Sequence, residues 1–148
     1  MGLRAAVGRG PVALDTAAFI YFIEDHPRYA PLVARLFSDA DRGVRLIVTS
    51  ALTLLEVLIV SYRAGDLALA ERYEAILTHS RGVRLVELDR TQLRAAAELR
   101  AAQRVRTPDA LQLAAALTQR CSAFVTNDRA MPDVPGLRVL QLSDYLER

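Results

Sequence analysis

Four acidic residues stand where carboxylates could carry out chemistry: Asp15, Glu56, Asp109 and Asp128. Carboxylates brought within a few ångströms of one another repel, so without a cation at least one of them stays protonated. Hard oxygen ligands suit Mg²⁺ or Mn²⁺, which keep several waters and bind through a few carboxylates. A cation held in this way lowers the pKa of a bound water and stabilises charge on a phosphoryl oxygen. If the fold brings these acids together, hydrolysis of phosphodiester bonds is the chemistry that they predict.

Glu56 is the least expected acid in the chain. Within residues 52–60 only Thr53 and Glu56 are polar, and their spacing of three places them on one face of a helix. A helix that is apolar on nearly every side is expected to be buried. A buried carboxylate must be paired or bound to a cation, so the alternative role for Glu56 is a salt bridge to an arginine.

The other three acids also have ordinary structural explanations when each is taken alone. Asp15 can cap a helix that starts at Thr16. Asp109 lies in the first turn of a helix, where a carboxylate interacts favourably with the helix dipole. Asp128 can be a turn residue within residues 127–129. None of these explanations accounts for the set of four.

Short β-rich runs alternate with longer helical patterns along the chain, which predicts one α/β domain over residues 1–148 with a parallel sheet covered on both faces. Strands are expected at 12–14, 45–49, 83–88, 123–126 and 137–142. Helices are expected at 16–24, 31–40, 50–64, 67–79, 89–105 and 107–120, the third capped by Ser50 and the last by Thr107 with Pro108 in its first position.

The predicted strands give two of the acids a common location. In a parallel α/β sheet, residues just past the carboxyl ends of the strands line the ligand crevice, which is deepest where the strand order reverses. Asp15 follows the first strand and Asp128 follows the fourth. If these two strands flank the reversal, Asp15 and Asp128 face each other across it.

The four acids and their neighbours form an ordered set of motifs: Leu14-Asp15-Thr16, Ser50-x2-Thr53-x2-Glu56-Val57, Thr107-Pro108-Asp109-Ala110-Leu111 and Val125-Thr126-Asn127-Asp128. In that order the chain resembles the PIN-domain nucleases, and most closely the VapC-type toxins of bacterial toxin–antitoxin modules. The resemblance covers residues 12–142. One departure is Ala17, which stands where family members often carry Ser or Asn, two residues after the first Asp.

The resemblance implies a five-stranded sheet of order 3-2-1-4-5 and a Mg²⁺-dependent endoribonuclease that leaves a 5′-phosphate and a 3′-hydroxyl, with Mn²⁺ as a substitute metal. Asp15 and Asp109 are then expected to bind the metal directly. Glu56 and Asp128 are expected to bind it through water or to orient the attacking water. Two neighbouring hydroxyl groups are candidate hydrogen-bond donors behind these ligands: Thr16 and Thr126.

Basic groups must surround an acidic pocket that binds a polyanion. All nineteen basic residues are arginines, and residues 81–106 hold seven of them against three acids. Guanidinium groups favour bidentate contacts to phosphate. Arg100, Arg104 and Arg106 are the candidates for contacts to the RNA backbone, with a solvated helix face as the alternative.

The overall composition indicates whether the protein has partners and where in the cell it is expected to lie. Apolar residues make up 52% of the chain and the mean hydropathy is +0.16, so part of the surface is expected to be covered. The resemblance implies a homodimer and a small antitoxin over the first four predicted helices. The most hydrophobic stretch, residues 46–60, is too short to span a bilayer and contains the charged Glu56. With one cysteine, Cys121, and no targeting signal, a cytoplasmic protein that does not engage membranes is expected.

Three other functions are compatible with parts of this pattern. A PIN-family nuclease that processes RNA without being a toxin would share the same chemistry. A catalytically inactive PIN-like module that binds RNA or protein would keep the fold but lose acids, whereas all four are present. A nucleotide-binding Rossmann protein is disfavoured, because the glycine-rich Gly8-Arg9-Gly10 precedes the first predicted strand instead of following it.

Overall fold

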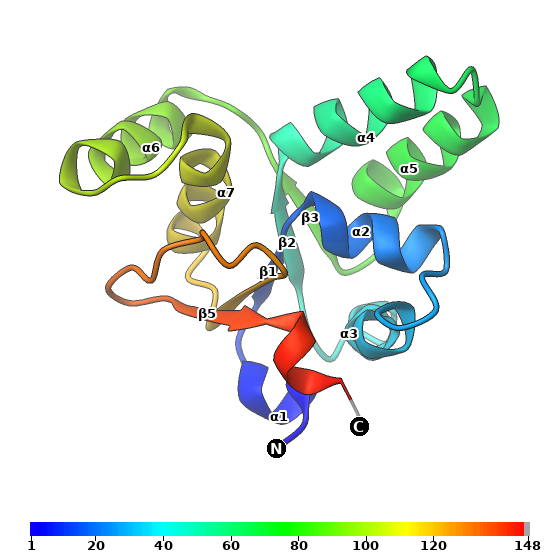
Figure 1. Cartoon of the computed structure of the whole chain (residues 1–148), viewed down its shortest axis with the longest axis horizontal. Coiled ribbons are helices and arrows are strands. Elements are labelled where there is room, and N and C mark those ends of the chain that lie inside the picture. Colours follow the sequence, from blue (N-terminus) through cyan, green and yellow to red (C-terminus); the bar gives the residue numbers. More distant parts are fainter. Residues whose placement is uncertain (147–148) are drawn as a thin grey trace.

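Five parallel strands form one sheet in the order β3-β2-β1-β4-β5 in the computed structural model, which describes residues 1–146 (Figure 1). The predicted α/β class and strand order are therefore confirmed. The strands are β1 (Val12–Leu14), β2 (Ile47–Ser50), β3 (Val83–Val86), β4 (Ala123–Thr126) and β5 (Arg138–Gln141). From β1 the sheet extends through β2 and β3 on one side and through β4 and β5 on the other, so the strand order reverses between β1 and β4. At this point Leu14 of β1 stands opposite Val125 of β4.

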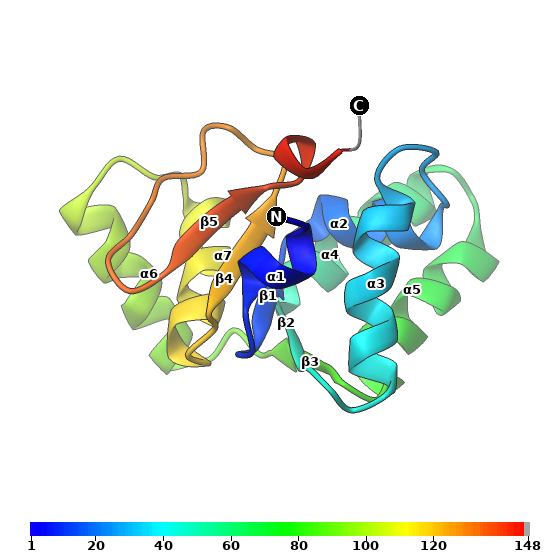
Figure 2. The ribbon, with the colours of Figure 1, turned by 90° about the horizontal axis from the view of Figure 1, so that it is seen from below.

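Helices cover the sheet in two layers, with α2 to α5 on one face and α6 and α7 on the other (Figures 1 and 2). They are α1 (Leu3–Val7), α2 (Thr16–Ile23), α3 (Ala30–Asp41), α4 (Ala51–Arg63), α5 (Leu67–His79), α6 (Arg90–Ala102) and α7 (Thr107–Thr118), followed by a 3-10 turn, η1 (Leu142–Tyr145). Helices α2 to α7 correspond to the six predicted helices, with ends shifted by at most a few residues, whereas α1 was not predicted. No helix within residues 1–146 is long and apolar enough to cross a membrane.

The start of α7 differs from the prediction. Thr107 is the first residue of the helix, and its N-cap is Arg106, which has extended backbone angles and no side-chain capping bond. The Thr107 hydroxyl instead accepts a hydrogen bond from Nη1 of Arg100 at 2.9 Å. The Thr107 hydroxyl, which the local sequence pattern predicted as a helix cap, thus forms a tertiary contact instead. Pro108 occupies the second helical position.

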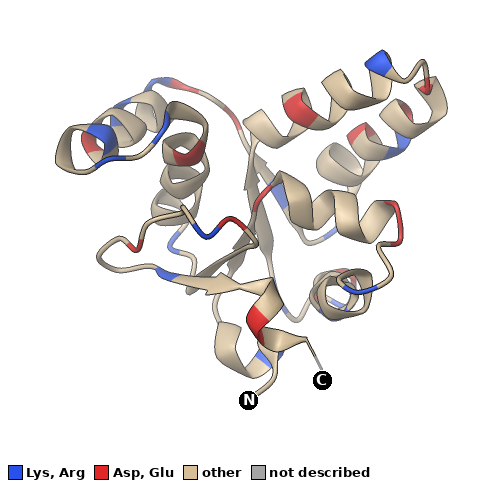
Figure 3. Cartoon of the chain, in the orientation of Figure 1, with Lys and Arg blue, Asp and Glu red and all other residues tan. Residues whose placement is uncertain are grey.

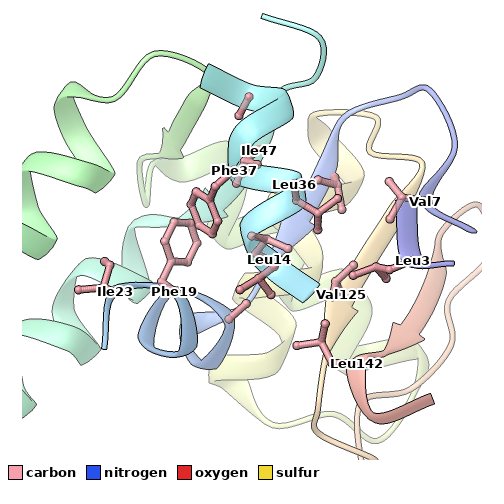
Figure 4. Packing of buried hydrophobic residues seen from close by; sticks show 14 of the residues in the cluster. Leu3, Val7, Leu14, Phe19, Ile23, Leu36, Phe37, Ile47, Val125 and Leu142 are labelled. Atoms are coloured by element: carbon pink, nitrogen blue, oxygen red, sulfur yellow. The ribbon is translucent and has the colours of Figure 1, made fainter. Parts of the chain in front are cut away.

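Two apolar cores hold the layers against the sheet. On the α2–α5 side, Phe19 meets Phe37 edge to face at 5.4 Å between ring centroids, close to Leu14 and Val125 (Figure 4). On the other side, Leu113 of α7 packs in the second core together with residues of the strands. Strands β1 and β4 are buried along their whole length, as expected for a parallel sheet covered on both faces. These cores hold in place the carboxyl ends of β1 and β4, which are followed by Asp15 and Asp128.

Helix α4 is much less buried than its sequence predicts. Among its residues only Thr53, Val57 and Ser61 are buried. Leu55, Val60 and Tyr62 are each more than half exposed. An apolar helix that projects side chains of this size into solvent has more apolar surface than the fold itself covers.

Candidate active site

Asp15 lies directly after β1 and caps α2. Its carboxylate accepts a hydrogen bond from the backbone N–H of Ala18 at 3.3 Å, so the predicted capping role is confirmed. The other carboxylate oxygen accepts a hydrogen bond from the Thr126 hydroxyl at 2.5 Å. Because Thr126 is the last residue of β4, the reversal of the sheet brings the ends of the first and fourth strands into contact at this carboxylate.

Burial raises the pKa of Asp15 to about 6 from an ordinary value of 3.8. The hydrogen bonds from Thr126 and Ala18 oppose this shift, and the negative charges of Asp128 and Glu56 add to it. Asp128 and Glu56 are therefore close enough to Asp15 for their charges to act on it. Asp15 has no compensating cation within the described part of the chain, which is the condition in which a carboxylate gains most from a bound metal ion.

Glu56 is held by a hydroxyl from another helix. The Thr16 hydroxyl donates to Oε1 of Glu56 at 2.9 Å and lies 3.4 Å from the Thr53 hydroxyl oxygen. Thr53 and Glu56 thus share a face, as their spacing predicts. No arginine forms an ion pair with Glu56 in residues 1–146, so the alternative of a salt bridge is not found there.

Asp128 lies in the loop after β4. One of its carboxylate oxygens accepts from the backbone N–H of Ala130 at 2.9 Å, which confirms the predicted turn role. Its own N–H donates to the Thr126 hydroxyl oxygen at 2.9 Å, and Nε2 of Gln141 donates to its carbonyl oxygen at 3.0 Å. Thr126 therefore links Asp128 to Asp15, since the same hydroxyl donates to one and accepts from the other.

Asp109 lies in the first turn of α7, as predicted. Its side chain is 17% exposed and pairs with Nε of Arg106 at 3.5 Å. It lines a hollow of about 390 Å³ together with Arg100, Arg104 and Ala130, so this hollow lies between the start of α7 and the loop that carries Asp128.

The three candidate arginines differ in their freedom to bind a substrate. The guanidinium of Arg100 donates through Nε to the carbonyl oxygen of Val105 at 3.0 Å and through Nη1 to Thr107, so it closes the connection between α6 and α7. Arg106 is 79% exposed and is held only by its i,i+3 contact to Asp109. Figure 3 shows basic segments on α6 and before α7 beside the acidic segments on α7 and at the strand ends.

The donor set suits a hard divalent cation that keeps much of its water. Within residues 1–146, no three His, Cys, Asp or Glu side chains lie close enough to form a complete protein ligand set. Mg²⁺ does not need one, because it commonly binds through one or two carboxylates and retains several waters. The partly buried Asp15, next to two more carboxylates and without an ion-pair partner in residues 1–146, provides the required kind of ligand.

Two polar residues behind the acids were not singled out from the sequence. Thr49, at 1% exposed, and Gln112, at 4% exposed, both hydrogen bond toward Thr53. Gln112 was detectable, since it is the only polar residue in the apolar run 110–117 and follows Asp109 by three positions. Thr49 was not, because threonine is an ordinary strand residue.

The chain belongs to the PIN domain family, whose pattern matches residues 12–137. Comparison with curated protein sequences finds no match. PIN domains are typically nucleases that use divalent metal ions.

Solved structures of toxin–antitoxin proteins share this fold. The chain is 18% identical to VapBC2 from Rickettsia felis, crystallised with a DNA fragment from its promoter, with a TM-score of 0.67 over 88% of this chain and 97% of the other. It is 17% identical to VapC20 of Mycobacterium tuberculosis, described as a sarcin-ricin loop cleaving toxin, with a TM-score of 0.64 over 81% and 92%. A toxin–antitoxin complex from Klebsiella pneumoniae is 17% identical, with a TM-score of 0.63 over 85% and 94%.

Changing Glu56 to Gln separates a role in the site from a role in stability. If the chain has the nuclease activity that is typical of PIN domains, we expect RNA cleavage to fall at least about tenfold, because a charged group of the candidate site is lost. We expect the free energy of unfolding to change by no more than about 0.5 kcal/mol, because Glu56 has no ionic partner to leave unpaired. Cleavage assays and urea denaturation of the two proteins measure both quantities.

Glu24→Gln is the matched control for this experiment. Glu24 also accepts a hydrogen bond from a hydroxyl on another helix, that of Tyr73 at 2.5 Å, but it lies at the far end of α2. Its substitution should leave cleavage unchanged. A loss of about 3–5 kcal/mol in Glu56→Gln would contradict this account, because it would reveal a buried cationic partner.

Proposed function

We propose that this protein is a Mg²⁺-dependent endoribonuclease and the toxin of a toxin–antitoxin pair. The single observation that supports this most is the state of Asp15, a partly buried carboxylate beside two further acids, with no cation to balance it among residues 1–146. The chain belongs to a family whose members are typically nucleases, which favours phosphodiester hydrolysis as the reaction of this site. Mn²⁺ would substitute for Mg²⁺, because both ions take hard oxygen ligands.

The four acids divide between two roles in this proposal. Asp15 and Asp109 supply direct ligands, whereas Glu56 and Asp128 act through water and orient the attacking water. The bound cation would lower the pKa of a water and stabilise charge on the phosphoryl oxygen. The hydroxyls of Thr126 and Thr16 hold their carboxylates in place through the hydrogen bonds at 2.5 and 2.9 Å.

Arginines around the hollow next to Asp109 bind the RNA backbone in the proposal. Arg104 and Arg106 line this hollow with exposed side chains, and guanidinium groups bind phosphate oxygens in a bidentate manner. Arg100 contributes mainly by holding the connection between α6 and α7, because two of its nitrogens already donate within the chain. Arg106 would move from Asp109 to a phosphate when a cation takes its place.

The exposed apolar face of α4 supports the proposed protein partners. Leu55, Val60 and Tyr62 are more than half exposed, and apolar side chains gathered in this way favour an interface. Solved relatives of the same fold were crystallised as toxin–antitoxin complexes. We propose that a second copy of the chain and a small antitoxin cover the surface formed by α2 to α5.

Metal removal tests the proposed reaction. Cleavage of RNA by the purified protein should vanish when EDTA is added and return with an excess of Mg²⁺ or Mn²⁺. The products should carry a 5′-phosphate and a 3′-hydroxyl, which ligation-based mapping of the new 5′ ends distinguishes from the cyclic phosphates left by metal-free ribonucleases. Full activity in EDTA would contradict the metal mechanism and point to general acid–base catalysis.

A further inference from the structure

Buried hydrogen bonds form a continuous line behind the acidic site. Nε2 of Gln112 lies 2.9 Å from Oγ1 of Thr53. Oγ1 of Thr53 lies 2.7 Å from Oγ1 of Thr49, whose hydroxyl donates to the carbonyl oxygen of Leu14 at 2.8 Å. The three side chains are between 0 and 4% exposed, so water does not compete for these bonds.

The direction of every bond in this line follows from the number of available protons. A hydroxyl has one proton, and a carbonyl oxygen has none. Thr49 must use its proton on Leu14, so Thr53 is the donor in the contact between the two threonines. The oxygen of Thr53 is then free to accept from Gln112. All the bonds run in the same sense, and aligned hydrogen bonds strengthen one another in a medium of low polarity.

Three of the four members of this line lie on elements that carry or directly precede one of the acids, and the fourth, Thr49, lies on β2. Gln112 lies one turn after Asp109 on α7. Thr53 lies one turn before Glu56 on α4. Leu14 directly precedes Asp15 at the end of β1. The line therefore connects α7, α4, β2 and β1, four elements that packing alone would hold through apolar contacts with little directional preference.

We propose that Thr53 and Gln112 are positioning residues, which hold α4 and α7 at the separation from β1 that the cation site requires. This inference rests on the proposed metal-dependent function. A second contact supports it, because the Thr16 hydroxyl that donates to Glu56 also lies 3.4 Å from the Thr53 oxygen. Oε1 of Gln112 is buried without a partner in the described residues.

The test replaces Thr53 by Val, which keeps the shape of the side chain and removes its hydroxyl. The matched control is Ser61→Ala on the same helix. Ser61 is also fully buried, but its hydroxyl donates only to the carbonyl oxygen of Val57 at 2.8 Å and connects to no other element. Thr53→Ser restores the hydroxyl, and Gln112→Met breaks only the first bond of the line.

Three quantities are measured for each protein: the melting temperature, the affinity for Mn²⁺ by calorimetric titration and the rate of RNA cleavage. We expect Thr53→Val and Gln112→Met to weaken Mn²⁺ binding and to slow cleavage by about 10–100-fold, the range for residues that orient metal ligands. Thr53→Ser should recover most of both. Ser61→Ala should keep both within about twofold, even if its melting temperature falls as far as that of Thr53→Val.

The positioning role is refuted if Thr53→Val binds Mn²⁺ and cleaves RNA like the wild type. It is also refuted if Ser61→Ala loses as much as Thr53→Val at equal melting temperature, because the effect would then be general loosening of α4. Wild-type protein that neither binds Mn²⁺ nor cleaves RNA would overturn the proposed function, and the positioning role with it. The wild-type measurement therefore distinguishes the two failures.

Discussion

Asp15→Asn is expected to lower the rate of RNA cleavage about 10³-fold and, at the same time, to stabilise the metal-free protein. The substitution is nearly isosteric, and Asn caps helices as well as Asp does, so α2 should be kept. Loss of a charged ligand removes several kcal/mol of charge stabilisation in the transition state, where each 1.36 kcal/mol corresponds to a factor of ten. Asp109→Asn should slow cleavage to a similar extent, and the double variant should lose no more cleavage activity than either single one.

The gain in stability depends on pH, with a sign that the pKa of Asp15 determines. Its value of about 6 in the folded protein lies above the ordinary value of 3.8. The folded state therefore holds this proton more tightly than the unfolded state, and the wild type loses stability as the pH rises from about 4 through 6. Asn has no proton to lose. In EDTA, Asp15→Asn should be more stable by about 1–3 kcal/mol at pH 8 and show little gain at pH 4.

Asp66→Asn is the matched control for Asp15→Asn. Asp66 caps α5 through a hydrogen bond from the backbone N–H of Leu69 at 3.0 Å, but it is exposed in the α4–α5 turn. Its substitution should leave cleavage unchanged. On the toxin proposal, expression of the wild type and of Asp66→Asn arrests bacterial growth, whereas Asp15→Asn does not. Equal arrest by Asp15→Asn at matched soluble levels would contradict the nuclease assignment.

Asp39→Asn is expected to destabilise the fold by about 3–5 kcal/mol, the range for breaking a buried ion pair. Asp39 is 1% exposed and accepts hydrogen bonds from Arg4 at 2.8 and 3.1 Å, from Arg42 at 3.2 Å and from Arg45 at 3.5 Å. Arg45 is itself only 7% exposed, so the variant would leave a buried guanidinium without its counter-ion. Urea denaturation at pH 7 measures the loss, which corresponds to roughly 6–20 °C in melting temperature.

The contribution of Asp39 should disappear at low pH. Burial opposes its ionisation, but the hydrogen bonds and charges of the surrounding guanidinium groups prevail and hold the pKa of Asp39 below its ordinary value of 3.8. Its stabilisation is therefore complete above about pH 4 and is lost as the pH falls through the lower pKa of the folded state. The stabilities of the wild type and Asp39→Asn should converge once the pH falls below the pKa of Asp39 in the folded protein. The exposed Asp144, paired with Arg129 at 2.8 Å, is the control, and Asp144→Asn should cost less than about 1 kcal/mol. An equally small cost for Asp39→Asn would contradict the buried-pair account.

The sequence by itself determined the alternation of elements and the location of the acids along them. Continuous apolar runs such as Val12–Leu14 and Ala123–Thr126 predict buried parallel strands, because such strands contact helices on both faces. Local capping chemistry located the starts of α2 and α4, since Asp15 and Ser50 satisfy backbone N–H groups within three residues. The spacing of Thr53 and Glu56 likewise placed both on one helix face.

Only the tertiary structure decided how those elements meet. The partners of Glu56, Asp39 and Asp15 are Thr16, Arg4 and Thr126, which lie 40, 35 and 111 residues away in the chain. Nothing in local propensity or hydrophobic period specifies such pairs, because those signals extend over a few residues at a time.

The same limit explains the predictions that were wrong. Thr107 has the sequence of a helix cap, but Arg100 from the preceding helix binds its hydroxyl. Helix α4 has the composition of a buried helix, yet its exposure depends on which elements pack beside it, and only one side of it faces the rest of the chain. The hydrophobic effect favours the burial of apolar surface without specifying which surface covers it. A sequence therefore shows that apolar surface must be buried, whereas the fold decides how much of that surface stays exposed for a partner to cover.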